Sequence, residues 1–260
     1  MPLLNGLAAI LDFLGSTGLV RLLIIGAVLF GLWLGLARAG FPRPQRVRTW
    51  LLVAVPLVAW FALVWLLATA GALQARPGAP PLLPVAIFAP VLLGLVLLTR
   101  SSRIAAALDA IPPAWLVGLQ VYRIFGGAFL VQFALGKLSA VFALPAGTGD
   151  VMVGLLALPV AFYLNHNPAG GRAAAVAWNL FGVLDLVLAI TLGFLSSTGR
   201  LQGLGVAPAP LSYPLVMVPA FAVPLSVILH GMSLWQLKRR ARGQAAPRDV
   251  AATAIARSTA

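Results

Sequence analysis

The chain has 260 residues, of which 61% are hydrophobic and only 9% are charged, and it contains no cysteine. Soluble domains carry about a quarter charged residues, so this composition excludes a soluble fold, while the lack of cysteine excludes disulfides and thiolate chemistry. The net charge of +13 does not indicate nucleic-acid binding, because basic residues in a membrane protein mark its cytoplasmic loops.

Runs of apolar sequence long enough to cross a bilayer recur along the chain. A spanning helix needs about 20 apolar residues, and its backbone satisfies its own hydrogen bonds. We therefore predict an all-α integral membrane protein with a bundle of seven transmembrane helices. The predicted spans are 18–37, 49–72, 81–99, 114–136, 149–165, 173–195 and 213–236.

Two shorter segments are predicted to lie at the membrane surface. Residues 1–17 are apolar but too short to span, so we predict an interfacial segment before span one. Residues 101–113 place Ile104, Leu108 and Ile111 on one helical face, which predicts an interfacial helix before span four. The membrane domain is then 18–237, and the small, polar and basic tail at 238–260 is predicted to be disordered.

The distribution of basic residues predicts the orientation. The loop after span one and the tail after span seven hold most of the basic residues. The positive-inside rule therefore places the N-terminus outside and the C-terminus in the cytoplasm. The overall pattern resembles that of small bacterial inner-membrane proteins, so we expect a multi-pass protein of a bacterial-type inner membrane, with the lipid bilayer as its partner.

Two opposite charges are predicted near the middle of the bilayer. Arg123 lies about ten residues into span four, and Asp185 lies at a similar depth in span six, roughly 15 Å from the surface. Because a bare charge is costly there, we predict that the two side chains form an ion pair inside the bundle. This pair either fixes helix packing or forms the polar centre of a path for a ligand or ion.

Further polar and aromatic residues accompany this pair. Gln120 and Tyr122 lie beside Arg123, and Trp178 lies on the Asp185 side of span six. Asn179 lies about 120° from Asp185, which favours a hydrogen bond to a different helix. With Arg123 and Asp185, these are the candidate ligand-binding residues: Gln120, Tyr122, Trp178 and Asn179.

Lys137 and Asp150 bracket a predicted outer loop at 138–149. The sequence before Asp150 is typical of a helix start, with Thr148 as N-cap and Asp150 in the first turn. The sharper alternative is an ion pair between Lys137 and Asp150 that closes the outer mouth of a cavity.

Span seven is predicted to bend at its prolines. Pro219 and Pro224 cannot donate backbone hydrogen bonds. Beyond them, Ser226, His230 and Ser233 share one helical face. A neutral, hydrogen-bonded His230 is the default expectation, and a proton-sensitive gate is the alternative.

No motif in the sequence fixes a reaction. No nucleophile–base set, phosphate-binding loop, metal-ligand set or cofactor motif is visible, so an enzyme ranks last. The leading hypothesis is binding or transport of a small solute or ion in a polar cavity centred on Arg123 and Asp185, with Arg123 as the natural contact for an anionic solute. The rival is a non-transporting sensor or interaction subunit whose charges only hold helices together.

Overall fold

The computed structural model describes residues 5–7, 9–10, 18–74, 82–197, 199–200 and 212–258. These residues are mostly helical and no strand occurs among them, which confirms the predicted all-α class. The elements are α2 (Leu19–Arg38), α3 (Arg43–Thr69), α4 (Leu82–Arg100), α5 (Ser102–Ala110), α6 (Pro113–Gly118), η1 (Leu119–Gly126), α7 (Gly127–Ala134), α8 (Ala140–His166), α9 (Pro168–Ser197), η3 (Val218–Ala222) and α10 (Val223–Ser258).

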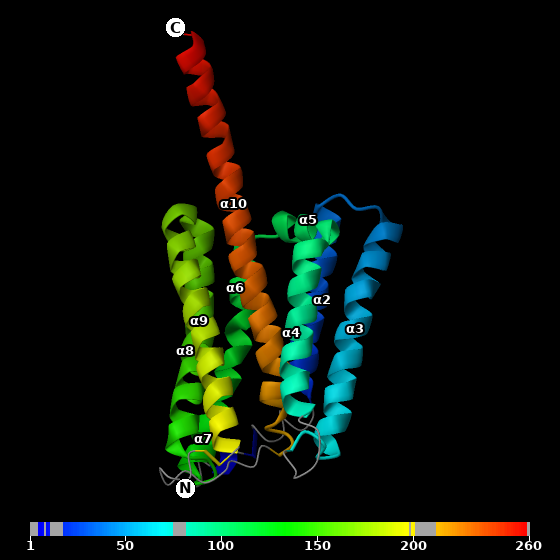
Figure 1. Ribbon diagram of the computed structural model, residues 1–260, viewed down its shortest axis with the longest axis vertical. Coiled ribbons are helices and arrows are strands. Elements are labelled where there is room, and N and C mark those ends of the chain that lie inside the picture. The colour runs from blue at the N-terminus through cyan, green and yellow to red at the C-terminus, as the bar shows by residue number, and fades with distance from the viewer. Residues whose placement is uncertain are drawn as a thin grey trace.

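The helices form two groups joined by α10. Figure 1 shows α6 to α9 on one side and α2 to α5 on the other, with α10 running between them. α10 contacts both α4 and α9, and α8 packs along α9 and against η1. α5 lies across the end of the bundle at which α10 leaves it, and α2 begins at the opposite end (Figure 1).

Six of the described helices are long and apolar enough to cross a membrane. A seventh is added if α4 and α5, which bend by 84° at their junction, count as one span. The most apolar window of α3 is only 22% buried, whereas those of α8 and α10 are each 50% buried. Apolar side chains that face outward in this way suit contact with acyl chains, so the chain is a helical membrane protein.

The short helix predicted before span four is present as α5. Ser101 is its N-cap, and the hydroxyl of Ser101 accepts a hydrogen bond from the amide of Ile104 at 3.3 Å. Ile104, Leu108 and Ile111 are all buried, so the predicted apolar face is confirmed. The other predicted surface segment, 1–17, lies outside the described residues except for 5–7 and 9–10.

Polar side chains of α10 hold the C-terminal end of α5. Gln236 donates to the carbonyls of Ile111, at 2.8 Å, and of Leu108. Arg240 donates to the carbonyls of Asp109 and Ile111, at 3.0 and 2.7 Å. The last carbonyls of a helix have no partner within it, so these donors satisfy acceptors that would otherwise need water.

Two spans differ from their predicted form. Span four is not one regular α-helix, because α6 and α7 are separated by the 3₁₀ stretch η1. Span five begins at Ala140, so the predicted outer loop at 138–149 is mostly helical. The glycines of that segment suggested a turn, but Gly147 and Gly149 instead make room for Leu130 and Asp185 of neighbouring elements.

The predicted break in span seven occurs as the π-helical turn η3, which precedes α10. A π-helical turn is wider than an α-helical one and tolerates the missing donor of Pro219. Phe221 of η3 is fully buried, and its ring centroid lies 4.6 Å from that of Trp60 and 5.1 Å from that of Phe61. α10 continues to Ser258, where the sequence predicts a disordered tail; the many alanines of this segment favour helix.

The close approach of α2 and α5 gives a testable prediction. A Cβ on Gly35 would lie 2.7 Å from the carbonyl oxygen of Ala107, whereas a Cβ on Gly26 of the same helix would meet nothing within 4 Å. We expect Gly35→Ala to lower the free energy of unfolding by about 1–3 kcal/mol, because α5 must shift. Gly26→Ala is the matched control and should be neutral or slightly stabilising in thermal unfolding of the purified protein. Equal stability of the two variants would contradict the observed packing.

Candidate functional site

Arg123 lies at the centre of the bundle and is only 3% exposed. It belongs to η1, which packs against α8. Its guanidinium reaches Asp150 on α8, Asp185 on α9 and His230 on α10. Four elements that are distant in sequence therefore meet at one cation.

Each nitrogen of the guanidinium has a protein partner. Nε and Nη2 both lie 2.7 Å from Oδ1 of Asp150, and Nη2 also donates to Oδ2 of Asp185. Nη1 donates to the carbonyl of Gly182 and lies within hydrogen-bond distance of Nε2 of His230, both at 3.2 Å. The predicted ion pair between Arg123 and Asp185 is confirmed, and Asp150 is a second acidic partner of the same arginine.

The tautomer of His230 follows from this geometry. A guanidinium can only donate, so Nε2 of His230 accepts and the proton of the neutral ring is on Nδ1. Nδ1 then donates to Oδ1 of Asn179 at 2.9 Å, and the amide of Asn179 donates to Ser233 Oγ at 3.0 Å and to the carbonyl of Ala175 at 2.7 Å. We call Arg123, Asp150, Asp185, His230 and Asn179 the Arg123 cluster.

Trp178 forms one wall of the cluster. Its ring centroid lies 5.1 Å from that of His230, and its indole N–H donates to the carbonyl of Val153 at 3.1 Å. Both side chains are buried, so the aromatic ring excludes water from the His230 side. Trp178 therefore supports the cluster by contact and has no charge to add to it.

Gln120 and Tyr122 join η1 to α10 beside the cluster. The amide of Gln120 donates to the carbonyl of Ser226 at 3.1 Å, and the hydroxyl of Tyr122 lies 2.6 Å from Ser226 Oγ. Oε1 of Gln120 is buried and has no hydrogen-bond partner among the described residues. These contacts fix the register of η1 against α10, and thus the position of Arg123 between them.

Glycines provide the space that the cluster occupies. A Cβ on Gly149 would overlap the carboxylate of Asp185, and a Cβ on Gly126 would overlap that of Asp150. A Cβ on Gly182 would lie 2.5 Å from Nε2 of His230. Any larger residue at these positions would push a charged or polar group out of place, so the glycines serve packing around the cluster.

The predicted pairing of Lys137 with Asp150 is wrong. Asp150 lies ten residues after the start of α8, about 15 Å along the helix, and not in its first turn at the outer surface. At that depth it faces Arg123, with which it pairs. Lys137 is exposed in the turn after α7, and among the described residues it forms no ion pair.

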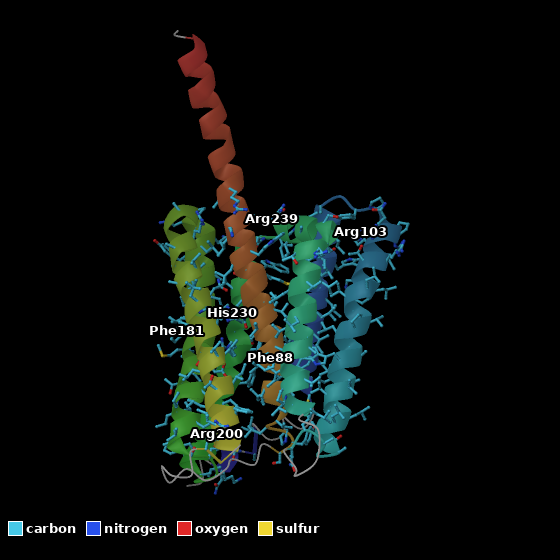
Figure 2. The ribbon with its side chains drawn as sticks, in the orientation of Figure 1. Phe88, Arg103, Phe181, Arg200, His230 and Arg239 are labelled. Carbon is cyan, nitrogen blue, oxygen red and sulfur yellow. The ribbon has the colours of Figure 1, made fainter. Side chains whose placement is uncertain are left out.

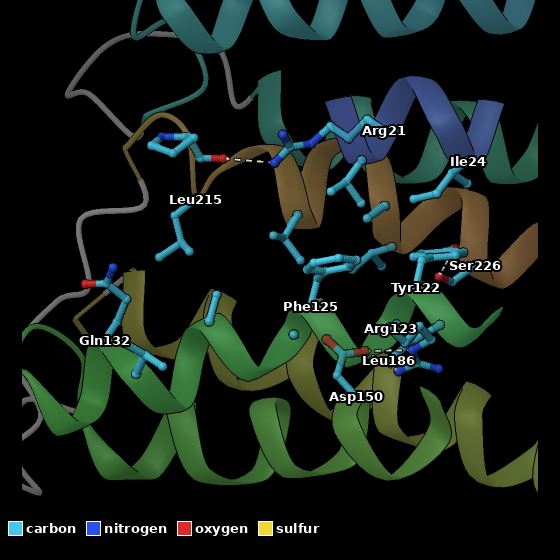
Figure 3. A pocket seen from close by; sticks show the side chains of 18 residues that line it. Arg21, Ile24, Tyr122, Arg123, Phe125, Gln132, Asp150, Leu186, Leu215 and Ser226 are labelled. Atoms are coloured by element: carbon cyan, nitrogen blue, oxygen red, sulfur yellow. Dashed lines mark hydrogen bonds and ion pairs between the residues drawn. The ribbon is translucent and has the colours of Figure 1, made fainter. Parts of the chain in front are cut away.

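A cavity of about 110 Å³ reaches the Arg123 cluster, which is room for several water molecules. Figure 3 shows it between α2 and η3 on one side and η1, α7 and α8 on the other. Arg123 and Asp150 lie at one end, and Gln132 and Leu215 lie at the other (Figure 3). Asp185 does not line it. The polar lining residues are Arg21, Tyr122, Arg123, Gln132, Asp150 and Ser226.

Arg21 lies in the first turn of α2, a position from which a long basic side chain can extend to the membrane surface. Instead it is 8% exposed, lines the cavity and donates to the carbonyl of Pro214 at 3.4 Å. The sequence feature that could have indicated this burial is the position of Arg21 inside α2, two residues after the helix begins. The direction of its side chain depends on the turn at Pro214, which no local pattern specifies.

Residues 80–238 match the model of a family described as a domain of unknown function, DUF8737. The chain belongs to this family. The matched segment of the DUF8737 chain holds every member of the Arg123 cluster, whereas α2 and α3 precede it. No curated protein and no solved structure matches the chain.

Removing the central cation should be costly in this DUF8737 member. Arg123→Leu leaves two buried carboxylates without their partner, and we expect it to lower the free energy of unfolding by about 3–5 kcal/mol. The triple variant R123L/D150N/D185N should recover much of this loss, because no buried charge remains. The control is Arg239→Leu, which breaks an ion pair with Asp109 whose side chains are 48% and 36% exposed, and should cost less than about 1 kcal/mol. A triple variant no more stable than R123L in denaturant titrations would refute the cluster.

The tautomer of His230 is directly observable. His166 and His230 are the two histidines of the chain, so the ¹⁵N spectrum of histidine-labelled protein contains two rings. We expect His230 to be a neutral ring protonated on Nδ1 throughout the range in which Arg123 is bound to Nε2. His166→Gln, at an exposed position, assigns the signals. A ring protonated on Nε2, or an imidazolium, would contradict the hydrogen bond from Arg123.

Proposed function

We propose that the protein binds a small solute or ion in the cavity beside the Arg123 cluster and passes it across the membrane. The observation that carries this proposal is a cavity that ends on two ionisable side chains, Arg123 and Asp150, deep within apolar helices. Charged groups inside a membrane are expensive and generally belong to paths for ions or solutes. The π-helical turn η3, which contributes Val218 and Ala222 to the lining, is the kind of irregularity that transporters use at such paths.

The proposed topology has seven spans, with α4 and α5 together forming the third, the N-terminus outside and the C-terminus in the cytoplasm. Figure 2 supports this orientation, since Arg103 and Arg239 lie at the end where α10 leaves the bundle. The opposite end, with Arg200, would face outward, and the cavity extends from the cluster toward that end (Figures 2 and 3). The membrane we propose is a bacterial-type inner membrane.

The bonding within the Arg123 cluster affects which solute or ion the cavity could bind. The sequence suggested Arg123 as a contact for an anionic solute. All three nitrogens of that guanidinium are already bonded to protein groups, so an anion would have to displace a carboxylate, His230 or the carbonyl of Gly182. The two carboxylates in the cluster favour a cation over an anion.

The rival function is a sensor or interaction subunit in which the cluster is purely structural. The bonding of all three guanidinium nitrogens to protein groups is the observation that favours it, because a well-bonded ion pair is also what helix packing alone would require. The cavity favours transport, since packing alone gives no reason to leave space beside a buried carboxylate.

Filling the cavity tests the proposal. Ala222 lines the cavity, whereas Ala59 of α3 is exposed and does not. We expect vesicles containing the wild-type chain to pass at least one of a set of probes: protons under a potassium diffusion potential, sodium, acetate, urea or glycerol. Ala222→Phe should reduce that flux to the level of empty vesicles, and Ala59→Phe should not.

The measurements are the fluorescence of an internal pH or sodium dye and osmotic swelling of the vesicles. Wild-type vesicles that match empty ones for all probes would refute transport and favour the sensor. A flux that Ala222→Phe leaves intact would show that the cavity is not the path.

A further inference from the structure

We propose that the Arg123 cluster holds one exchangeable proton, carried on the carboxyl group of Asp150 and taken up from the cavity. This inference rests on the proposed function only for the role of the proton as the transported ion. The proton-binding site itself follows from geometry and charge.

The charges of the cluster do not balance. Arg123 contributes one positive charge, while Asp150 and Asp185 contribute two negative charges when both are ionised. His230 is neutral, because its Nε2 accepts from the guanidinium. One carboxylate charge is therefore left over in a site where Arg123, Asp150, Asp185 and His230 are each less than 9% exposed. An unpaired buried charge is neutralised by a proton or by a bound cation.

Among the described residues, no other charged group bonds to the two carboxylates of the cluster. Nη2 of Arg123 bonds to both carboxylates at once, which holds their oxygens near each other. Around Asp150, η1 contributes Arg123 and Tyr122, α9 contributes Asp185, and α10 contributes His230. From α2, Arg21 faces the same cavity and donates a hydrogen bond to the carbonyl of Pro214 at 3.4 Å.

Asp150, and not Asp185, is the carboxylate that meets the cavity. Asp150 lines it and its side chain is 12% exposed, compared with 5% for Asp185. Oδ1 of Asp150 is bonded to Arg123, and Oδ2 accepts no hydrogen bond from the described part of the chain. Oδ1 of Asp185 likewise accepts no hydrogen bond from the described residues, but Asp185 does not line the cavity. Oδ2 of Asp150 is thus the unbonded carboxylate oxygen that lies beside the cavity.

A proton fits this site better than a metal cation. A bare cation needs several oxygen ligands to replace its water, and among the described residues no group of three or more His, Asp or Glu side chains could hold one. Most of the lining residues are apolar and cannot replace the water ligands of a metal ion. A proton needs only one free oxygen and a few water molecules to reach it.

The step is a simple acid–base reaction. A hydronium ion in the cavity transfers a proton to Oδ2 of Asp150, so that an O–H bond forms there and a water molecule is released. Arg123 then keeps one full ionic partner, Asp185, and the cluster becomes neutral. Loss of the proton restores the second ionic partner, so the position of Arg123 between α8 and α9 is coupled to proton occupancy.

Infrared difference spectroscopy of the full chain in lipid nanodiscs tests this directly. At neutral pH the wild type should show the C=O stretching band of a buried carboxylic acid, shifted in D₂O and lost at alkaline pH. Asp150→Asn and Asp185→Asn should each abolish the band, because one carboxylate remains for one arginine. Asp109→Asn, which affects only the exposed pair with Arg239, should leave it unchanged.

Three results would overturn the proposal. If the spectrum of the wild type lacks the band, the cluster holds no proton, and this result is obtained without any variant. A band that persists in Asp185→Asn would mean that burial, and not the excess charge, retains the proton. A band that moves in Asp185→Glu but not in Asp150→Glu would place the proton on the other carboxylate.

The vesicle experiments separate this inference from the proposed function. The expected band together with no flux of any probe would support the proton site and refute transport. Flux of sodium, acetate, urea or glycerol through wild-type vesicles without the band would support transport and refute the proton.

Discussion

The ionic bonding of Arg123 is the interaction on which this bundle depends. A guanidinium in the middle of an apolar bundle is tolerated only when all its donors are bonded and its charge is compensated. Here the acceptors come from α8, α9 and α10, so satisfying one side chain brings together three long helices. His230, which accepts from Arg123, donates to Asn179, and Asn179 donates to Ser233. These hydrogen bonds fix α9 against α10.

The rest of the fold accommodates that arrangement. Span four changes to a 3₁₀ helix where it carries Arg123, and span seven begins with a π-helical turn beside the cavity. Both departures from regular α-helix lie next to the polar centre, as is common for functional sites in helices. Further along α10, Gln236 and Arg240 donate hydrogen bonds to carbonyls of α5 and of Ile111 after it, so this one helix bonds both to the cluster and to the end of the bundle.

The cavity gives the cluster a chemical asymmetry. One carboxylate is enclosed by helices, while the other has an oxygen facing space that water can occupy. Two similar groups around one arginine thus differ in access, and a difference in access is what separates an ion-binding group from a structural one. The proposed proton site and the proposed transport both follow from this asymmetry.

The sequence alone determined the membrane class, most of the helices and the Arg123–Asp185 pair, because lipid leaves few ways to satisfy a backbone or a mid-span charge. It also indicated α5 through the spacing of its apolar residues. It failed at Asp150, because glycine and proline before it are equally compatible with a turn and with a helix packed closely on its neighbours. The second carboxylate, the hydrogen bond from Arg123 to His230 and the cavity beside Arg21 were decided only by tertiary structure. They depend on how helices rotate and approach each other, which the composition of any single helix does not specify.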